Sequence, residues 1–225
     1  MTAAGVHRPP QAARARPGAA ALAGRRLTRL YLVSRRVPAA FALLAGLGIL
    51  LWAALDGRWD IAGGPAAREL IPLVIETGAA AIIAVTTYGP FGEQERPTGR
   101  WLPWLRLGAI VLVTAVAAGA LAAGATGGDL PGGTVAMLRD VAGMTGTGLL
   151  TAVAFGGAFG WAGPMAYLLL TEAALTRSPS TPWIWAARPP DDLGAALCAY
   201  GVFAAGLAAV ALAGARDSGR PPIPR

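Results

Sequence analysis

Long uncharged stretches alternate along this chain with short segments that carry arginine. Four stretches contain no charged residue: 37–55, 107–128, 141–171 and 193–215. A fifth, residues 70–91, contains a single charge, Glu76, before Phe91. About 20 apolar residues in a helix cross the ~30 Å hydrocarbon layer of a bilayer. A helix also satisfies its own backbone hydrogen bonds there. The pattern therefore predicts an all-α integral membrane protein that crosses the bilayer several times.

The uncharged stretch 141–171 is too long for a single span, because one helix of that length would extend about 46 Å. The glycine-rich segment 156–160 inside it is typical of a tight reversal, so we expect two helices. Six spans are then predicted: 37–55, 69–88, 106–124, 135–155, 159–175 and 194–214. Together they form a membrane domain over residues 22–215, with tails at 1–21 and 216–225.

The arginines predict how these spans are oriented. All 19 basic residues are arginine. With six spans and an inner N-terminus, the inner side holds all but five of them. The five on the outer side are Arg58, Arg68, Arg139, Arg177 and Arg188. Because cytoplasmic loops are enriched in basic residues, we expect both termini and Arg96 in the cytoplasm.

Composition agrees with a membrane protein and excludes other classes. Hydrophobic residues make up 55% and charged residues 14% of the chain, against about 25% charged in soluble domains. The basic excess lies beside the predicted spans, which favours topology and contact with anionic lipids of the cell membrane over nucleic-acid binding. The sequence thus predicts a protein of the plasma membrane without a nucleic-acid partner.

The chain lacks the residues that most enzymes of a membrane would need. Without lysine it can form no P-loop, Schiff base or Ser-Lys dyad. It has no HExxH motif, His7 is the only histidine, and Cys198 is the only cysteine, so no disulfide can form within the chain. We expect no catalytic activity, no metal site and no cofactor in this chain.

The segment before the first span has an amphipathic pattern. Residues 22–36 place Leu27, Leu30 and Tyr31 on one face and Arg25, Arg29 and Arg36 on another. Such a pattern predicts a helix that lies on the inner membrane surface and leads into the first span.

The inner loop between spans two and three, residues 88–106, is chemically the most specific part of the sequence. Prolines divide it into short pieces, and Phe91 stands beside Glu93, Glu95 and Arg96. Two interpretations remain open. The loop is a connector anchored by interfacial tryptophans, or it projects an apolar side chain flanked by carboxylates into the groove of a basic partner.

Three segments carry a resemblance to a known family. They are GPFGEQERPTGRWLPWLRLG (89–108), LRDVAGMTGTGLLTAVAFGGAFGWAGPMAYLLL (138–170) and TPWIWAARPPDD (181–192). Over residues 25–215 the chain resembles actinobacterial ABC transporter permeases, which are similar to the transmembrane subunits of type-2 ABC exporters. The outer loops are too short to form a periplasmic domain, which argues against lipoprotein-handling or efflux-assembly types.

The resemblance implies an architecture and a set of partners. It implies an amphipathic connecting helix, six spans, and a coupling helix at Phe91–Arg96 that contacts a separate ATPase subunit holding ATP and Mg²⁺. It also implies a dimer of permease subunits. A partly re-entrant outer segment at residues 178–192 would place Trp183 and Trp185 at the membrane interface.

Glu76 is the one clear ionisable group well inside a predicted span, about 10 Å from its end. Because a charge at that depth is costly, we expect Glu76 to face the helix bundle. Two roles remain open for it and its neighbour Thr77. Glu76 forms a structural bond to another span, for example to Thr145 or Thr147, or it lines a translocation path.

The sequence thus predicts the permease subunit of an ABC transporter, an exporter, powered by a partner ATPase. The expected partners are that ATPase, a second permease subunit and membrane lipids. The alternative from a different class is a multi-pass membrane scaffold or assembly subunit without a transport path.

Overall fold

The computed structural model describes residues 37–56, 64–87, 102–175 and 183–213. The long helices are α2 (Val37–Leu55), α3 (Gly64–Val85), α4 (Leu102–Gly124), α5 (Gly133–Phe155), α6 (Ala162–Leu175) and α7 (Leu193–Ala213). The short 3₁₀ helices are η2 (Ala125–Gly127), η3 (Gly157–Phe159) and η4 (Trp185–Ala187). These described ranges contain no β-strand, which confirms the all-helical prediction for them. The predicted amphipathic helix at 22–36 lies outside them.

Each long helix coincides, within a few residues, with one of the predicted spans. Among the residues that the structure describes, three helical segments are long and apolar enough to cross a membrane, judged by length and composition: Val37–Leu55, Arg106–Gly127 and Leu193–Ala213. The apolar part of α3, Leu70–Val85, is shorter. These helices indicate association with a membrane, whereas six crossings stay a prediction.

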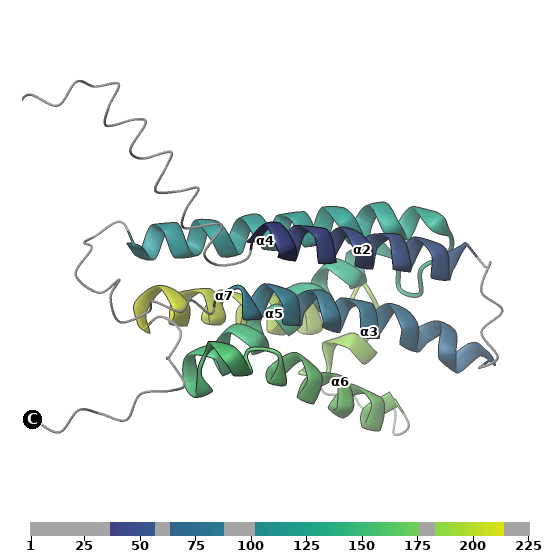
Figure 1. The fold of residues 1–225 in the computed structure, drawn as a ribbon. Helices are drawn as coiled ribbons and strands as arrows, with labels where there is room; N and C mark the ends of the chain where they lie inside the picture. The colour runs from purple at the N-terminus through teal and green to yellow at the C-terminus, as the bar shows by residue number, and fades with distance from the viewer. Residues whose placement is uncertain (1–36, 57–63, 88–101, 176–182, 214–225) are drawn as a thin grey trace, which may run out of the picture.

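The helices pack side by side with alternating direction (Figure 1). α2, α4 and α6 run one way, and α3, α5 and α7 run the other. The start of α2 and the end of α7 therefore lie at the same end of the bundle as the junction between α3 and α4. α5 is the central helix and packs against α3, α6 and α7, while α2 packs mainly on α4.

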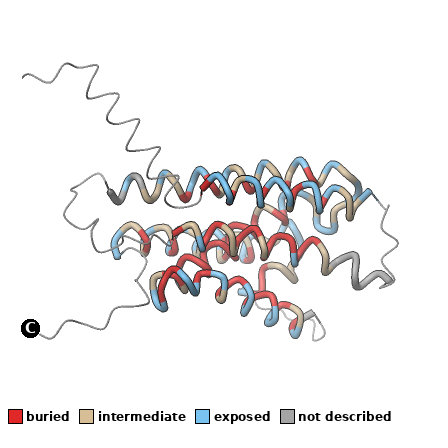
Figure 2. Tube along the Cα trace, viewed as in Figure 1, coloured by how far each residue is buried: buried red, intermediate tan, exposed pale blue. Residues whose placement is uncertain are grey.

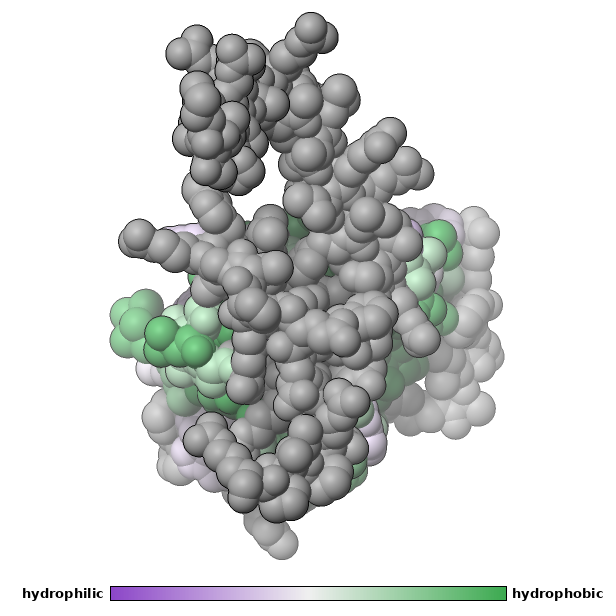
Figure 3. Space-filling model, turned by 60° about the vertical axis from the view of Figure 1, so that its left-hand side comes forward, coloured by the Kyte–Doolittle hydropathy of each residue, from purple (hydrophilic) through white to green (hydrophobic). Residues whose placement is uncertain are grey.

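The surface of this bundle differs from that of a water-soluble protein. The exposed side chains described on α2, α4 and α7 are all uncharged, and they include Ile49, Leu197 and Leu212. In contrast, the largest fully buried side chain is that of Arg139 on α5. Buried residues cluster along α3 and α5 (Figure 2), and apolar residues make up most of the described surface visible in Figure 3. An apolar exterior, with the charged residues kept inside a mainly apolar core, is the arrangement that a lipid environment favours.

Polar residues are tolerated in α5 because its neighbours shield it from the surroundings. The predicted reversal between α5 and α6 is present and depends on Gly156. This residue has a φ of +108°, which favours glycine, and its N–H donates to the carbonyl of Ala152 at 3.1 Å. The turn returns the chain along α5, so α6 covers one side of that helix.

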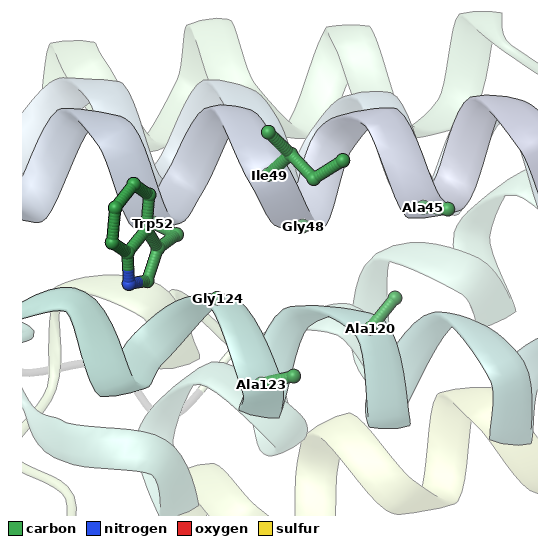
Figure 4. A pocket seen from close by; sticks show the side chains of 7 residues that line it. All are labelled: Ala45, Gly48, Ile49, Trp52, Ala120, Ala123 and Gly124. Carbon is green, nitrogen blue, oxygen red and sulfur yellow. The ribbon is translucent and has the colours of Figure 1, made fainter.

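α2 and α4 cross with their backbones in close contact. A Cβ atom added to Gly48 would lie 2.5 Å from the carbonyl oxygen of Ala120. Beside the crossing is a groove of about 330 Å³, shown in Figure 4 with Trp52 at one end. Its lining consists of Ala45, Gly48, Ile49, Trp52, Ala120, Ala123 and Gly124. This lining is apolar and contains no ionisable side chain that could bind a charged group.

Candidate functional site

The site centres on the guanidinium of Arg139, near the start of α5. The residue is 2% exposed, and three of its N–H groups have partners. Nε donates to Asp140 Oδ1 at 2.9 Å, Nη1 to the carbonyl oxygen of Pro189 at 2.8 Å, and Nη2 to that of Arg188 at 3.1 Å. A buried guanidinium is stable only when it is paired in this way. Arg139 therefore connects α5 to the chain just before α7.

Two carboxylates accompany this one guanidinium. Asp140 is 6% exposed and Glu76, from α3, is 5% exposed. The charges of Asp140 and Arg139 both act on Glu76. We call Glu76, Arg139 and Asp140 the charged cluster. When both carboxyls are ionised, the formal charges of the cluster sum to one negative charge, and the cluster contains no second basic group to balance it.

Arg139 faces the interior of the bundle. The sequence pattern counted it among the basic residues of the outer side, and it lies near the start of α5; the side of the membrane that this end faces stays a prediction. The physical reason for its burial is local: Asp140 and two backbone carbonyls supply enough acceptors to hold the guanidinium inside. A charge near the end of a predicted span need not reach the water when such partners are available.

The structure gives neither suggested hydroxyl partner to Glu76. Thr147 Oγ1 donates to the carbonyl of Met144 at 2.7 Å. Thr145 Oγ1 is buried and has no hydrogen-bond partner among the described residues. Thr77 Oγ1 donates to the carbonyl of Leu73 at 2.7 Å. Thr147 and Thr77 thus donate to carbonyls of their own helices, which is common for threonine in a helix, and Thr77 Oγ1 also lies 3.3 Å from Met144 Sδ on α5. The interactions shown for Glu76 are therefore those with the charged cluster.

Residues 183–192, which we call the folded-in segment, pack against α5, α6 and α7 through η4. Trp183 is 49% exposed, but Trp185 is only 3% exposed. Trp185 is therefore buried among the helices, and the interfacial depth of the two tryptophans stays a prediction. Its indole stacks on the ring of Tyr167, with centroids 4.2 Å apart and planes at 12°. Stacking inside the bundle provides this tryptophan with more contact than a membrane interface would.

Comparison with known proteins finds no matching family model, curated protein or solved structure. The assignment of function therefore depends on the residues themselves. The predicted coupling residues Phe91, Glu93, Glu95 and Arg96 lie outside the described residues. Within the described ranges, no group of three His, Cys, Asp or Glu side chains is arranged to hold a metal ion.

The folded-in segment ends at a helix cap. Asp192 Oδ1 accepts from the backbone N–H of Ala195 at 3.0 Å, and Oδ2 accepts from Arg188 Nε at 2.7 Å. Both bonds hold the pKa of the Asp192 carboxyl below its usual value, and the bond from Ala195 has the larger effect. Asp192 thus caps the start of α7 and stays ionised, so it fixes the folded-in segment to the last helix.

Sequence reasoning found Glu76 but missed its neighbours. One feature of the sequence could have identified these neighbours. The adjacent pair Arg139 and Asp140 lies inside the predicted span 135–155, and charged residues within a span call for partners inside the bundle. Gly143 and Tyr167 carried no comparable signal, because small and aromatic residues are common in such helices. The site brings together two carboxyl groups and one guanidinium, which are groups suited to binding and holding charge.

The two carboxylates of the charged cluster should respond differently to removal of charge. Asp140→Asn weakens a charge-assisted hydrogen bond to Arg139 and should lower the free energy of unfolding by about 1.5–3 kcal/mol. Glu76→Gln removes the unbalanced negative charge while keeping the shape of the side chain, so stability should be retained or should rise. Thermal unfolding in detergent would measure both variants.

Asp129→Asn, at an exposed position, serves as the control and should match the wild type. A Glu76→Gln variant less stable than Asp140→Asn would contradict this ordering. It would instead mean that Glu76 is the main partner of Arg139.

Proposed function

We propose that the chain is the permease subunit of an ABC transporter, an exporter, in the plasma membrane. In this proposal six helices cross the bilayer, both termini are cytoplasmic, and two permease subunits bind two copies of a separate ATPase. ATP hydrolysis on the ATPase drives the cycle. The chain itself carries out no covalent step.

The order and direction of the helices support the proposal. Alternating directions bring the start of α2, the α3–α4 junction and the end of α7 to one end of the bundle (Figure 1). A partner bound at this end would contact the junction loop, which includes Phe91, Glu93 and Glu95. The opposite end has the folded-in segment immediately before the last helix, in the position where the resemblance implies a re-entrant outer segment.

A charge retained inside the bundle also supports a transport role. The charged cluster has one more carboxylate than it needs to balance Arg139, and such a group is costly in a membrane protein. Intramembrane ionisable residues of this kind commonly mark substrate or ion pathways. A scaffold without a path would have no use for this cost.

Co-purification tests the proposal. The tagged chain, extracted from its native membrane in mild detergent, should bring down an ATPase with a Walker motif. Glu93→Arg together with Glu95→Arg should reduce recovery of that ATPase at least about tenfold, because like charges would replace attraction at a partly desolvated contact. Insertion of the chain into the membrane should not change.

A matched control reverses two carboxylates at the opposite end of the bundle. Asp129 and Asp191 are both exposed there, and Asp129→Arg with Asp191→Arg makes the same change in net charge. This control should retain the ATPase. Absence of any ATPase from the wild-type preparation would favour the scaffold alternative, and equal loss in both double variants would refute the coupling role of the junction loop.

A further inference from the structure

The folded-in segment is held inside the bundle by side-chain contacts more than by its own secondary structure. Its only regular element is the three-residue η4, Trp185–Ala187. Yet Ile184 and Trp185 are 5% and 3% exposed, while Asp191 further along is exposed. Such a short element has few backbone hydrogen bonds. The position of the segment therefore depends on its contacts with the surrounding helices.

The first contact is a notch in α5 that receives Trp185. A Cβ atom added to Gly143 would lie 2.5 Å from Cε2 and 2.7 Å from Nε1 of Trp185. The indole therefore occupies the space that any other residue at position 143 would fill. On its other side the ring stacks on Tyr167, whose hydroxyl oxygen accepts the N–H of Ala186 at 3.2 Å.

The second contact is the pair of hydrogen bonds from Arg139 to the carbonyls of Arg188 and Pro189. Because these bonds reach the backbone, they hold the path of the chain independently of the side chains at 188 and 189. The same guanidinium bonds to Asp140. The segment is thus fastened directly to the charged cluster.

The seated position also leaves a polar group unpaired. Trp185 Nε1 is buried and has no hydrogen-bond partner among the described residues. Burying an unpaired donor is unfavourable, and water would satisfy this N–H if the segment withdrew. The bonds from Arg139 therefore favour the seated position, whereas the unpaired N–H of Trp185 opposes it.

We propose that the folded-in segment is a gate over the charged cluster, latched by Arg139 and seated by Trp185 in the Gly143 notch. In the closed position it separates Glu76 and Asp140 from the outer side. In the open position Trp185 leaves the notch and water reaches the cluster. This inference rests on the proposed function, since a gate requires a path to close.

Gly143→Ala tests the gate with the smallest change available, because its methyl group competes with Trp185 for the notch. The reporter is Ala186→Cys on a Cys198→Ala background, reconstituted in nanodiscs and labelled with a charged maleimide. Position 186 packs against the core around Trp185, so labelling of the closed gate is slow. Gly143→Ala should speed labelling about tenfold or more, since overpacking of this kind shifts an equilibrium by at least that factor.

Two further variants make the result specific. Gly201→Ala adds the same methyl group on α7, where nothing lies within 4 Å, and should leave the labelling rate unchanged. Trp185→Phe combined with Gly143→Ala provides a smaller ring for the narrowed notch and should restore slow labelling. An unchanged rate in Gly143→Ala would overturn the gate. A fast rate that Trp185→Phe fails to reverse would also overturn it, because the whole bundle would then have loosened.

This labelling requires no ATPase, so it is independent of the permease assignment. If the three variants behave as expected but ATP and the co-purified ATPase leave the wild-type labelling rate unchanged, the gate stands and the proposed function fails. If nucleotide changes the wild-type rate while Gly143→Ala has no effect, the proposed function stands and this gate fails.

Discussion

Arg139→Met is expected to lower the free energy of unfolding by about 3–5 kcal/mol, the usual cost of removing one partner of a buried ion pair. The substitution leaves Asp140 without its cation, adds a second unbalanced charge beside Glu76, and frees the carbonyls of Arg188 and Pro189 from their donors. Titration with SDS in mixed micelles, followed by circular dichroism, would measure the loss.

Arg188→Met is the matched control for this experiment. Arg188 also pairs with an aspartate, but its side chain is 29% exposed, and partly exposed ion pairs contribute about 1 kcal/mol or less. The free energy of unfolding of Arg139→Lys should lie between those of the wild type and Arg139→Met. One ammonium group cannot reproduce the planar set of donors by which the guanidinium reaches three acceptors. Equal stability of Arg139→Met and Arg188→Met would show that the charged cluster does not hold the fold together.

Gly48→Ala is expected to separate α2 from α4 and to lower stability by about 1–3 kcal/mol or more. Its new methyl group would meet the backbone oxygen of Ala120 at 2.5 Å, and backbone cannot rotate away as a flexible side chain can. Thermal unfolding in detergent would measure the effect. The groove in Figure 4 should change shape with it, because Gly48 and Ala120 both line that groove.

Gly46→Ala provides the control two residues away on the same helix. Nothing lies within 4 Å of its added methyl group, and alanine forms helices better than glycine. This variant should be as stable as the wild type or slightly more stable. If both variants have the same stability, the close crossing of α2 and α4 is not what holds these helices together.

The positions of the helices could be predicted from the sequence because they depend on local properties. Runs of apolar residues fix the length of α2 and α7, and the glycines at 156–160 mark the reversal before α6. The burial of Glu76 also follows from its depth in an apolar stretch. These features need no knowledge of which helix lies beside which.

The rest of the site depends on contacts between distant segments, and sequence patterns do not reveal them. The burial of Arg139 follows only once the carbonyls of Arg188 and Pro189 are known to lie beside it. The burial of Trp185 follows only once Gly143 is known to leave space for its ring. In both cases the partner lies in a segment distant in sequence, which the hydropathy pattern cannot show.

The burial of Arg139 and Asp140 in α5 has a consequence for biogenesis. In the proposed six-span arrangement, Arg139 and Asp140 oppose insertion of α5 as a lone helix, each by up to about 2.5–3.5 kcal/mol, the cost at the centre of a bilayer, and α5 is less apolar than α2, α4 or α7. We therefore expect α5 to leave the translocon only together with neighbours that shield its polar side, with α3 already in place and α6 following as a hairpin. For this chain, membrane insertion and tertiary folding would be one step rather than two.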